Sequence, residues 1–237
     1  VGEGYALIVN DLDPFRCEGV AGALSADGAT VMAMTGDVSV REQAEELVEM
    51  ATGGWGRLDV LVNCAGIFPN TPVIEMDDAE WDRVYGTNLR GPFLLSRAAA
   101  RAMIAGNSGE ARHIVNISST AGESARTGAA HYCGSKAALN MLTKVLAIEL
   151  APHGIRVNSV APGIIVDDVY ERASPPADPY VAALLAGIPL GRTGRGDDIA
   201  GAVRFLLTPA AEWITGEIIH VNGGSTAGRV TLPPSQF

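Results

Sequence analysis

The chain has 237 residues, of which 47% are hydrophobic, and is long enough for one α/β domain with a sizeable core. Its formal net charge of −10 argues against a nucleic-acid backbone as a partner. We expect a single domain in the cytoplasm with reduced thiols. No apolar run approaches the length of a membrane span, the start at Val1 lacks a signal-peptide pattern, and the three cysteines lack disulfide or metal-ligand spacing.

Short β-branched runs alternate with longer helical stretches, a pattern typical of βαβ units. Strands are expected at Ala6–Val9, Thr30–Met34, Asp59–Val62, His113–Ile117, Arg156–Val160 and Glu217–Val221. Helices are expected at Pro14–Ala26, Val40–Thr52, Asp78–Arg101, Ala130–Leu150, Asp178–Ala186 and Asp197–Leu207. Most strands lack polar alternation, which indicates helices on both faces of a parallel sheet. The sequence therefore predicts a three-layer α/β/α, doubly wound, Rossmann-like fold.

Local signals mark several element boundaries. Asp13 before Pro14 predicts an N-cap, and Ser39 with Glu42 predicts a capping box. An irregular, proline-rich stretch covers about residues 163–189. Loops of this length in compact α/β domains are often lids over a binding site, and composition leaves a lid and a plain surface insert equally open.

Tyr132 and Lys136 are the most informative pair. At positions i and i+4 they share one face of a predicted helix, so the ammonium can lie close to the phenol. A neighbouring cation stabilises a phenolate, which makes the pair a candidate general acid/base for an alcohol or carbonyl. Ser119 follows the predicted strand at His113–Ile117, at the sheet edge where ligands gather. Its hydroxyl could bind a substrate oxygen or cap the next turn.

With these residues in place, the sequence resembles the short-chain dehydrogenase/reductase family from Tyr5 to Gly224. The segments that carry the resemblance occur in the family's order: Asn63-Cys64-Ala65-Gly66 (with Cys64 at the family's second Asn), Asn88, Ile117–Ser119, Tyr132–Lys136, Pro162-Gly163 and Val221–Gly224. The resemblance, closest to NAD-dependent 3-oxoacyl reductases, implies an NAD(P)-dependent enzyme acting on CH–OH donors. Such an enzyme transfers a hydride between nicotinamide and a secondary alcohol or ketone.

The resemblance also implies catalytic roles. Tyr132 would exchange a proton with the substrate oxygen, to which Ser119 would hydrogen-bond. Lys136 would stabilise the phenolate and hold the nicotinamide ribose. Asn88 would hold a water that links Lys136 to solvent, although an asparagine there could equally fix a helix irregularity near Gly91.

Asp11, at the end of its predicted strand, indicates whether the protein prefers NAD or NADP. In the family, an acidic residue there binds the adenosine ribose 2′-hydroxyl and repels a 2′-phosphate, which favours NAD over NADP. Asp37 and Val38 resemble the pair that receives the adenine ring. The other positions implied in cofactor binding are Leu12, Asn63, Ala65, Gly66, Tyr132, Lys136, Pro162, Gly163 and Ile165. Asp167 stands where many relatives have a threonine, and no metal is expected.

The sequence departs from the family at its start. The family's first strand and its turn, T-G-x-x-x-G-x-G, have no counterpart before Asp11. That strand would lie between the strands at Ala6–Val9 and Asp59–Val62, so its loss predicts two unpaired edges and weak pyrophosphate binding. Either the native protein has a further N-terminal segment, or the chain is a cofactor-less relative acting as a binding or scaffold protein.

The substrate is expected to be a small carbonyl compound or alcohol of unspecified identity. Family members associate through two long helices, here 78–101 and 130–150. We therefore expect a homotetramer or homodimer, with no membrane or nucleic-acid partner.

Overall fold

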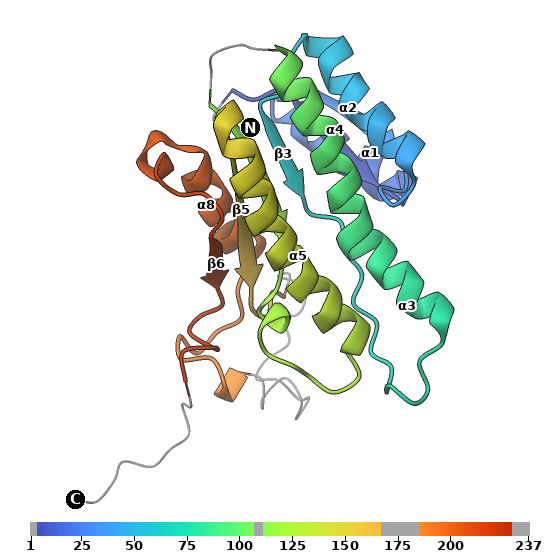
Figure 1. The fold of residues 1–237 in the computed structure, drawn as a ribbon, viewed down its shortest axis with the longest axis vertical. Helices are drawn as coiled ribbons and strands as arrows, with labels where there is room; N and C mark the ends of the chain where they lie inside the picture. The colour runs from blue at the N-terminus through green and yellow to red at the C-terminus, as the bar shows by residue number, and fades with distance from the viewer. Residues whose placement is uncertain (1–3, 107–110, 167–184, 229–237) are drawn as a thin grey trace, which may run out of the picture.

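The strands form two parallel sheets in a computed structural model that describes residues 4–106, 111–166 and 185–228 (Figure 1). The first sheet pairs β1 with β2, and the second has the order β3-β4-β5-β6. The strand bounds are β1 Leu7–Asp11, β2 Val31–Thr35, β3 Val60–Asn63, β4 Arg112–Ile117, β5 Ile155–Pro162 and β6 Ile218–Val221. Each expected strand is therefore confirmed, with its ends shifted by at most two residues.

Helices connect these strands in alternation. Their bounds are α1 Pro14–Ala26, α2 Arg41–Trp55, α3 Asp78–Tyr85, α4 Gly91–Gly106, α5 Ala130–Leu150 and α8 Gly196–Leu207. Short 3-10 turns in the described ranges are η2 Thr120–Gly122, η3 Ala151–His153 and η4 Pro209–Ala211. The predicted N-cap is confirmed, because the Asp13 carboxylate accepts the N–H of Phe15 at 2.9 Å. Most of the expected helix at 178–186 lies outside the described residues.

Two local expectations are wrong. The predicted helix Asp78–Arg101 is divided by a π-helical segment, η1, at Gly86–Arg90, and α4 then continues to Gly106. A π-turn adds one residue to the helical repeat, which a 3.6-residue periodicity does not reveal. The capping box at Ser39 is also absent, since Val40 is the N-cap of α2 and has no side-chain cap. The Asp37 carboxylate instead accepts the Ser39 N–H at 2.8 Å and forms a turn before the helix.

Alternate residues of the sheet face two separate cores. Ile114 and Val157 pack with α2, α4 and α5 on one face. Val115 and Val160 pack with Leu206 of α8 on the other. Side chains alternate along a strand, so this division places helices on both faces and confirms the three-layer α/β fold. In Figure 1, α4 and α5 lie side by side along the sheet, and α8 lies beside β5 and β6.

The two sheets are not hydrogen-bonded to each other through any described strand. β1 pairs only with β2, and β3 pairs only with β4, so each has one edge without a described partner. Val62 on β3 is accordingly 40% exposed, although it belongs to an apolar strand. This arrangement agrees with the two unpaired edges expected from the sequence. None of the helices in the described part of the chain is long and apolar enough to cross a membrane.

Candidate active site

The candidate site lies where β4 ends and α5 begins. Ser118 and Ser119 follow the last residue of β4, and the Ser118 hydroxyl donates to Asn140 Oδ1 of α5 at 2.6 Å. Ser119 is 9% exposed, and its Oγ accepts the N–H of Ala121 at 3.1 Å. Ser119 thus caps η2, which is the alternative role left open by its sequence. Capping uses the oxygen as an acceptor and leaves the hydroxyl hydrogen free to donate to another oxygen.

Lys136 is a buried cation at the end of β4. Only 4% of the residue is exposed, and Nζ donates to the Ile117 carbonyl at 2.8 Å. Loss of solvent lowers the pKa of Lys136 to about 8, and the charge interaction with Cys64 acts in the opposite direction. Desolvation also raises the pKa of the Cys64 thiol, which the Lys136 charge partly offsets. The ammonium has three N–H groups, so the bond to Ile117 leaves two for other acceptors.

Tyr132 lies beside this cation. The distance from Lys136 Nζ to the centre of the Tyr132 ring is 5.9 Å, within the range of a cation–π contact. Phe68, from the loop after β3, approaches the same ring edge-on, with 6.2 Å between centres. The structure therefore brings Tyr132 and Lys136 together as their i, i+4 spacing predicts.

A buried histidine fixes the first turn of α5, and sequence reasoning missed it. His131 is fully buried, and its Nδ1 accepts the N–H of Tyr132 at 2.8 Å. This bond assigns the ring hydrogen to Nε2, which donates to Glu80 Oε1 of α3 at 3.0 Å. A hydrogen bond from Thr71 and the contact with His131 hold the pKa of Glu80 below its usual value. No sequence periodicity relates residues 80 and 131, so only the tertiary structure reveals the pair.

Asn88 occupies the middle of η1 and ties three elements together. Its Oδ1 accepts the N–H of Ile67 and its Nδ2 donates to the Ile67 carbonyl, both at 2.9 Å. Nδ2 also donates to Ser135 Oγ of α5 at 3.2 Å. Both amide hydrogens are thus engaged, and the structure places Asn88 at a helix irregularity, as one of its two expected roles requires. Its contact with a water molecule stays a prediction.

Gly66 leaves open space beside these groups. A Cβ at this position would lie 3.4 Å from Asn88 Oδ1 and 3.6 Å from Lys136 Nζ. A side chain would therefore cover the lysine ammonium. The neighbouring Ala65 is exposed, whereas Asn63 is buried and donates to Ser96 and Asn116. The amide hydrogens of Asn63 thus support the core, and its role in cofactor binding stays a prediction.

The other cofactor positions lie at strand ends. Asp11 Oδ1 accepts the N–H of Asp13 at 2.9 Å, and the adjacent Leu12 is largely exposed. Asp37 is half-buried, but Val38 packs in the core against Gly91. At the end of β5, Pro162 pairs with Val221 and Gly163 lies against Asn222. Ile165 forms an isolated bridge with Gly194. Asp167 and most of the predicted lid fall in the stretch 167–184, outside the described residues.

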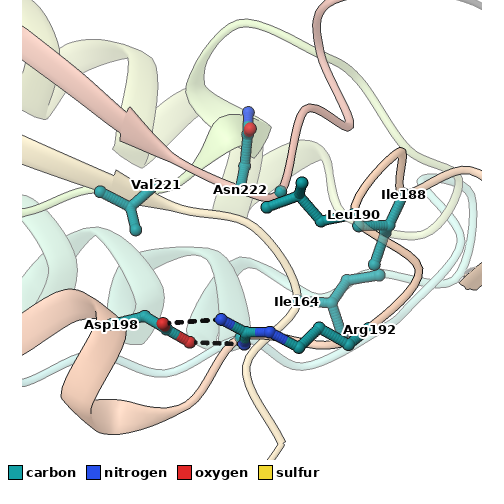
Figure 2. A pocket seen from close by; sticks show the side chains of 9 residues that line it. Ile164, Ile188, Leu190, Arg192, Asp198, Val221 and Asn222 are labelled. Carbon is teal, nitrogen blue, oxygen red and sulfur yellow. Dashed lines mark hydrogen bonds and ion pairs between the residues drawn. The ribbon is translucent and has the colours of Figure 1, made fainter.

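A separate small cavity of about 80 Å³ lies beyond the end of β6 (Figure 2). Arg192 and Asp198 close one side of it with paired hydrogen bonds of 2.7 and 2.9 Å. These bonds, with a backbone N–H from Arg195, hold the pKa of Asp198 far below its usual value. Neither Ser119, Tyr132 nor Lys136 lines this cavity, so it is distinct from the candidate active site.

Across the described ranges, no group of three His, Cys, Asp or Glu side chains could hold a metal.

A parallel α/β fold with serine, tyrosine and lysine at the carboxyl edge of its sheet is the arrangement of a Rossmann-like oxidoreductase. A family model described as "Enoyl-(Acyl carrier protein) reductase" matches residues 1–226 of the chain. The chain belongs to the short-chain dehydrogenase/reductase family.

Its relatives are similar along almost the whole chain. It is 40% identical over 223 residues to an uncharacterized oxidoreductase of Methylorubrum extorquens and 39% identical over 223 residues to the 3-oxoacyl-[acyl-carrier-protein] reductase FabG of Staphylococcus aureus. Each match covers 94% of this chain and 88% of the relative.

Solved structures agree with this assignment. A mutant short-chain dehydrogenase/reductase of Serratia marcescens is 34% identical with a TM-score of 0.85, and the match covers 95% of this chain and 89% of that one. A gluconate 5-dehydrogenase of Burkholderia cenocepacia, in complex with NADP and tartrate, is 31% identical with a TM-score of 0.85. That match covers 96% of this chain and 88% of the other.

Burial of Lys136 makes stability depend on pH. Between its folded pKa of about 8 and its usual 10.5, the native protein binds fewer protons than the unfolded chain, so stability rises with pH. Compared with Lys136→Met, the wild-type free energy of unfolding should gain about 1–3 kcal/mol from pH 7 to 10.5. Denaturant titrations at each pH measure this gain. A difference between the two proteins that does not vary with pH would contradict the lowered pKa.

Proposed function

We propose that this protein transfers a hydride between NAD(H) and a secondary alcohol or ketone, with Tyr132 as the general acid/base. The observation that carries the proposal is the contact between buried Lys136 and the Tyr132 ring, at the strand end that bears Ser119. Relatives support the reaction class. The names of two of them specify a 3-oxoacyl reductase and a gluconate dehydrogenase, which act on a ketone and an alcohol respectively.

The described residues fit a nicotinamide cofactor. Gly66 leaves space next to Lys136 Nζ, which has two N–H groups available for ribose hydroxyls. The carboxylate of Asp11 uses Oδ1 for a backbone turn, and its Oδ2 can accept a bond from an adenosine ribose hydroxyl. When bound, the nicotinamide ring supplies or accepts the hydride.

The side chains of this chain would handle the proton. In the reducing direction Tyr132 donates its phenolic proton to the carbonyl oxygen, and Ser119 donates a hydrogen bond to the same oxygen. Lys136 stabilises the resulting phenolate until a proton returns from solvent. The His131–Glu80 bond and the bond from Asn88 to Ser135 hold α5 in place, so the tyrosine and lysine keep their relative positions.

Tyr132→Phe tests the general acid/base role. Removal of the phenolic proton should lower kcat/KM by about 10²–10⁴-fold, as expected for loss of general acid catalysis. NADH oxidation across a set of ketones measures the effect. Tyr85→Phe is the matched control, because its hydroxyl lies against Gly134 of α5 yet has no part in the proposed chemistry.

Fluorescence titration with NADH separates the two outcomes that the sequence left open. NADH binding by the wild type, together with ketone reduction that Tyr132→Phe loses, supports the enzyme. Failure of the wild type to bind NADH would contradict the proposal and favour a binding or scaffold protein.

We propose NAD as the preferred cofactor, because a carboxylate at the end of β1 repels a 2′-phosphate. The nearest cation along the chain, Arg16, lies 3.6 Å from the Asp13 carboxylate and is occupied by it. Among the described residues 4–16, Arg16 is the one basic side chain.

Asp11→Ser combined with Leu12→Arg should reverse this preference. The exchange removes the repulsive charge and adds a guanidinium, so the ratio of kcat/KM for NADH to that for NADPH should fall by about 10- to 100-fold. Steady-state kinetics with both cofactors measure the ratio. A wild type that already prefers NADPH would overturn the assignment.

We also propose that the protein forms a homodimer or homotetramer through α4 and α5. Met141, Val145 and Ile148 recur on one face of α5 and are exposed, Ile148 by 76%, and Phe93 of α4 is exposed as well. Ile148→Glu would bury a charge at this contact and should shift the oligomer to a 24.6 kDa monomer in light scattering. A wild type that is already monomeric would refute the proposal.

A further inference from the structure

An exposed arginine lies over the proposed proton donor. The Arg126 guanidinium carbon is 5.5 Å from the centre of the Tyr132 ring, closer than Lys136 Nζ at 5.9 Å. Unlike the lysine, Arg126 is exposed, and it belongs to the loop between η2 and α5. Two cations therefore contact the same aromatic ring, one from the buried interior and one from the solvent side.

The loop that carries Arg126 is held at both ends. At its start, the Ser124 N–H donates to the Thr120 carbonyl at 2.9 Å. At its end, the carbonyl of Gly128 accepts the N–H of Thr71 at 2.8 Å. Gly128 has φ of +74°, and a Cβ there would collide with Asn70, so this junction requires glycine. Backbone hydrogen bonds thus anchor the loop that carries Arg126 at both of its ends.

Arg126 has no ion-pair partner among the residues that the structure describes, although the protein has ten more acidic than basic side chains. Of the other exposed arginines, Arg16 and Arg83 contact carboxylates. Arg41, Arg101 and Arg204 have no ion pair within the described part of the chain either. Glu123 is the carboxylate nearest to Arg126 in sequence, but its Oε2 lies 3.1 Å from His220 Nε2, a contact outside hydrogen-bond alignment. What distinguishes Arg126 is its position over the ring of the proposed proton donor, and a cation at this position favours an external anion beside the reacting group.

We propose that Arg126 binds an anionic group of the substrate, so that the preferred substrate is a carbonyl compound carrying a carboxylate or phosphate. This inference rests on the proposed function and specifies its substrate class. Because the guanidinium carbon lies 5.5 Å from the centre of the Tyr132 ring, a substrate whose carbonyl oxygen bonds to Tyr132 can place its anionic group against Arg126. Phe68, which is 69% exposed and edge-on to Tyr132, offers an apolar contact to the carbon chain between the two polar groups.

The reaction of such a substrate is a balanced two-electron reduction. A hydride from the reduced nicotinamide forms the new C–H bond, the C=O π bond breaks, and the oxygen takes the proton of Tyr132. The anionic group does not change during the reaction. Arg126 therefore contributes binding and orientation, and its effect should fall mainly on KM.

Matched substrates separate charge from shape. Acetoacetate and its ethyl ester share the ketone, but only the acid carries a charge. Acetoacetyl phosphopantetheine and acetoacetyl-N-acetylcysteamine share the thioester, but only the former carries a phosphate. Arg126→Gln should raise KM at least ~10-fold for the charged member of the preferred pair and change the neutral member less than ~2-fold. Arg126→Lys should restore part of the affinity, since it restores the charge without the bidentate geometry.

Arg204→Gln is the control variant, because it removes one positive charge from an exposed arginine in the last turn of α8. It should leave every KM unchanged. The pair that responds to Arg126→Gln identifies the source of the anion as a free oxo acid or a phosphorylated carrier. An equal loss for charged and neutral members, or no loss for either, would overturn the proposal.

A binding measurement makes the test independent of turnover. Calorimetric titration of acetoacetate and of acetoacetyl phosphopantetheine into the protein with NAD⁺ gives their Kd values in wild type and Arg126→Gln. A Kd for either anion that is ~10-fold higher in Arg126→Gln, with no turnover of any ketone, would support the anion site while contradicting the proposed reaction. Equal Kd values in both proteins would refute the anion site even if the neutral ketones are reduced.

Discussion

The hydrogen bond from Lys136 to the carbonyl of Ile117 is the constraint on which the site depends. It ties the first turns of α5 to the end of β4, and it directs an ammonium into a space where only 4% of the residue meets solvent. Burying a charge costs stability unless hydrogen bonds compensate, and the lowered pKa of Lys136 records this cost. In return, water screens the charge of a buried cation less than it screens the charge of an exposed one.

Buried polar side chains around Lys136 keep this arrangement rigid. Asn88 joins the loop after β3 to Ser135, and the His131–Glu80 pair joins α3 to the residue before Tyr132. Each of these bonds crosses between elements distant in sequence. A buried network whose members are all hydrogen-bonded permits a single relative position of its helices. The relative position of Tyr132 and Lys136 thus depends on residues that need not contact a substrate.

The sequence was sufficient for the strands, α1, α5 and the Tyr132–Lys136 pair, because these features depend on local periodicity and spacing. It was insufficient for η1, where the extra residue of a π-turn is accommodated by the tertiary bonds of Asn88 to Ile67. His131 and Arg126 were also missed. Their importance arises from contacts with Glu80 and with the Tyr132 ring, which no spacing rule relates to them. Local patterns therefore predicted that Tyr132 and Lys136 lie together, while long-range contacts determine how these two residues are held.

Two cations contact Tyr132, one buried and one exposed to solvent. This difference in exposure separates their proposed roles. Lys136 is buried, so little water or salt screens its charge. Arg126 is exposed, so solvent and ions screen its effect on the ring, and its guanidinium stays accessible to an incoming anion. A bidentate fork suits carboxylate or phosphate recognition, whereas a compact ammonium suits proton chemistry. Under the proposed function, the buried cation serves proton transfer and the exposed cation serves substrate binding, so a change in one need not alter the other.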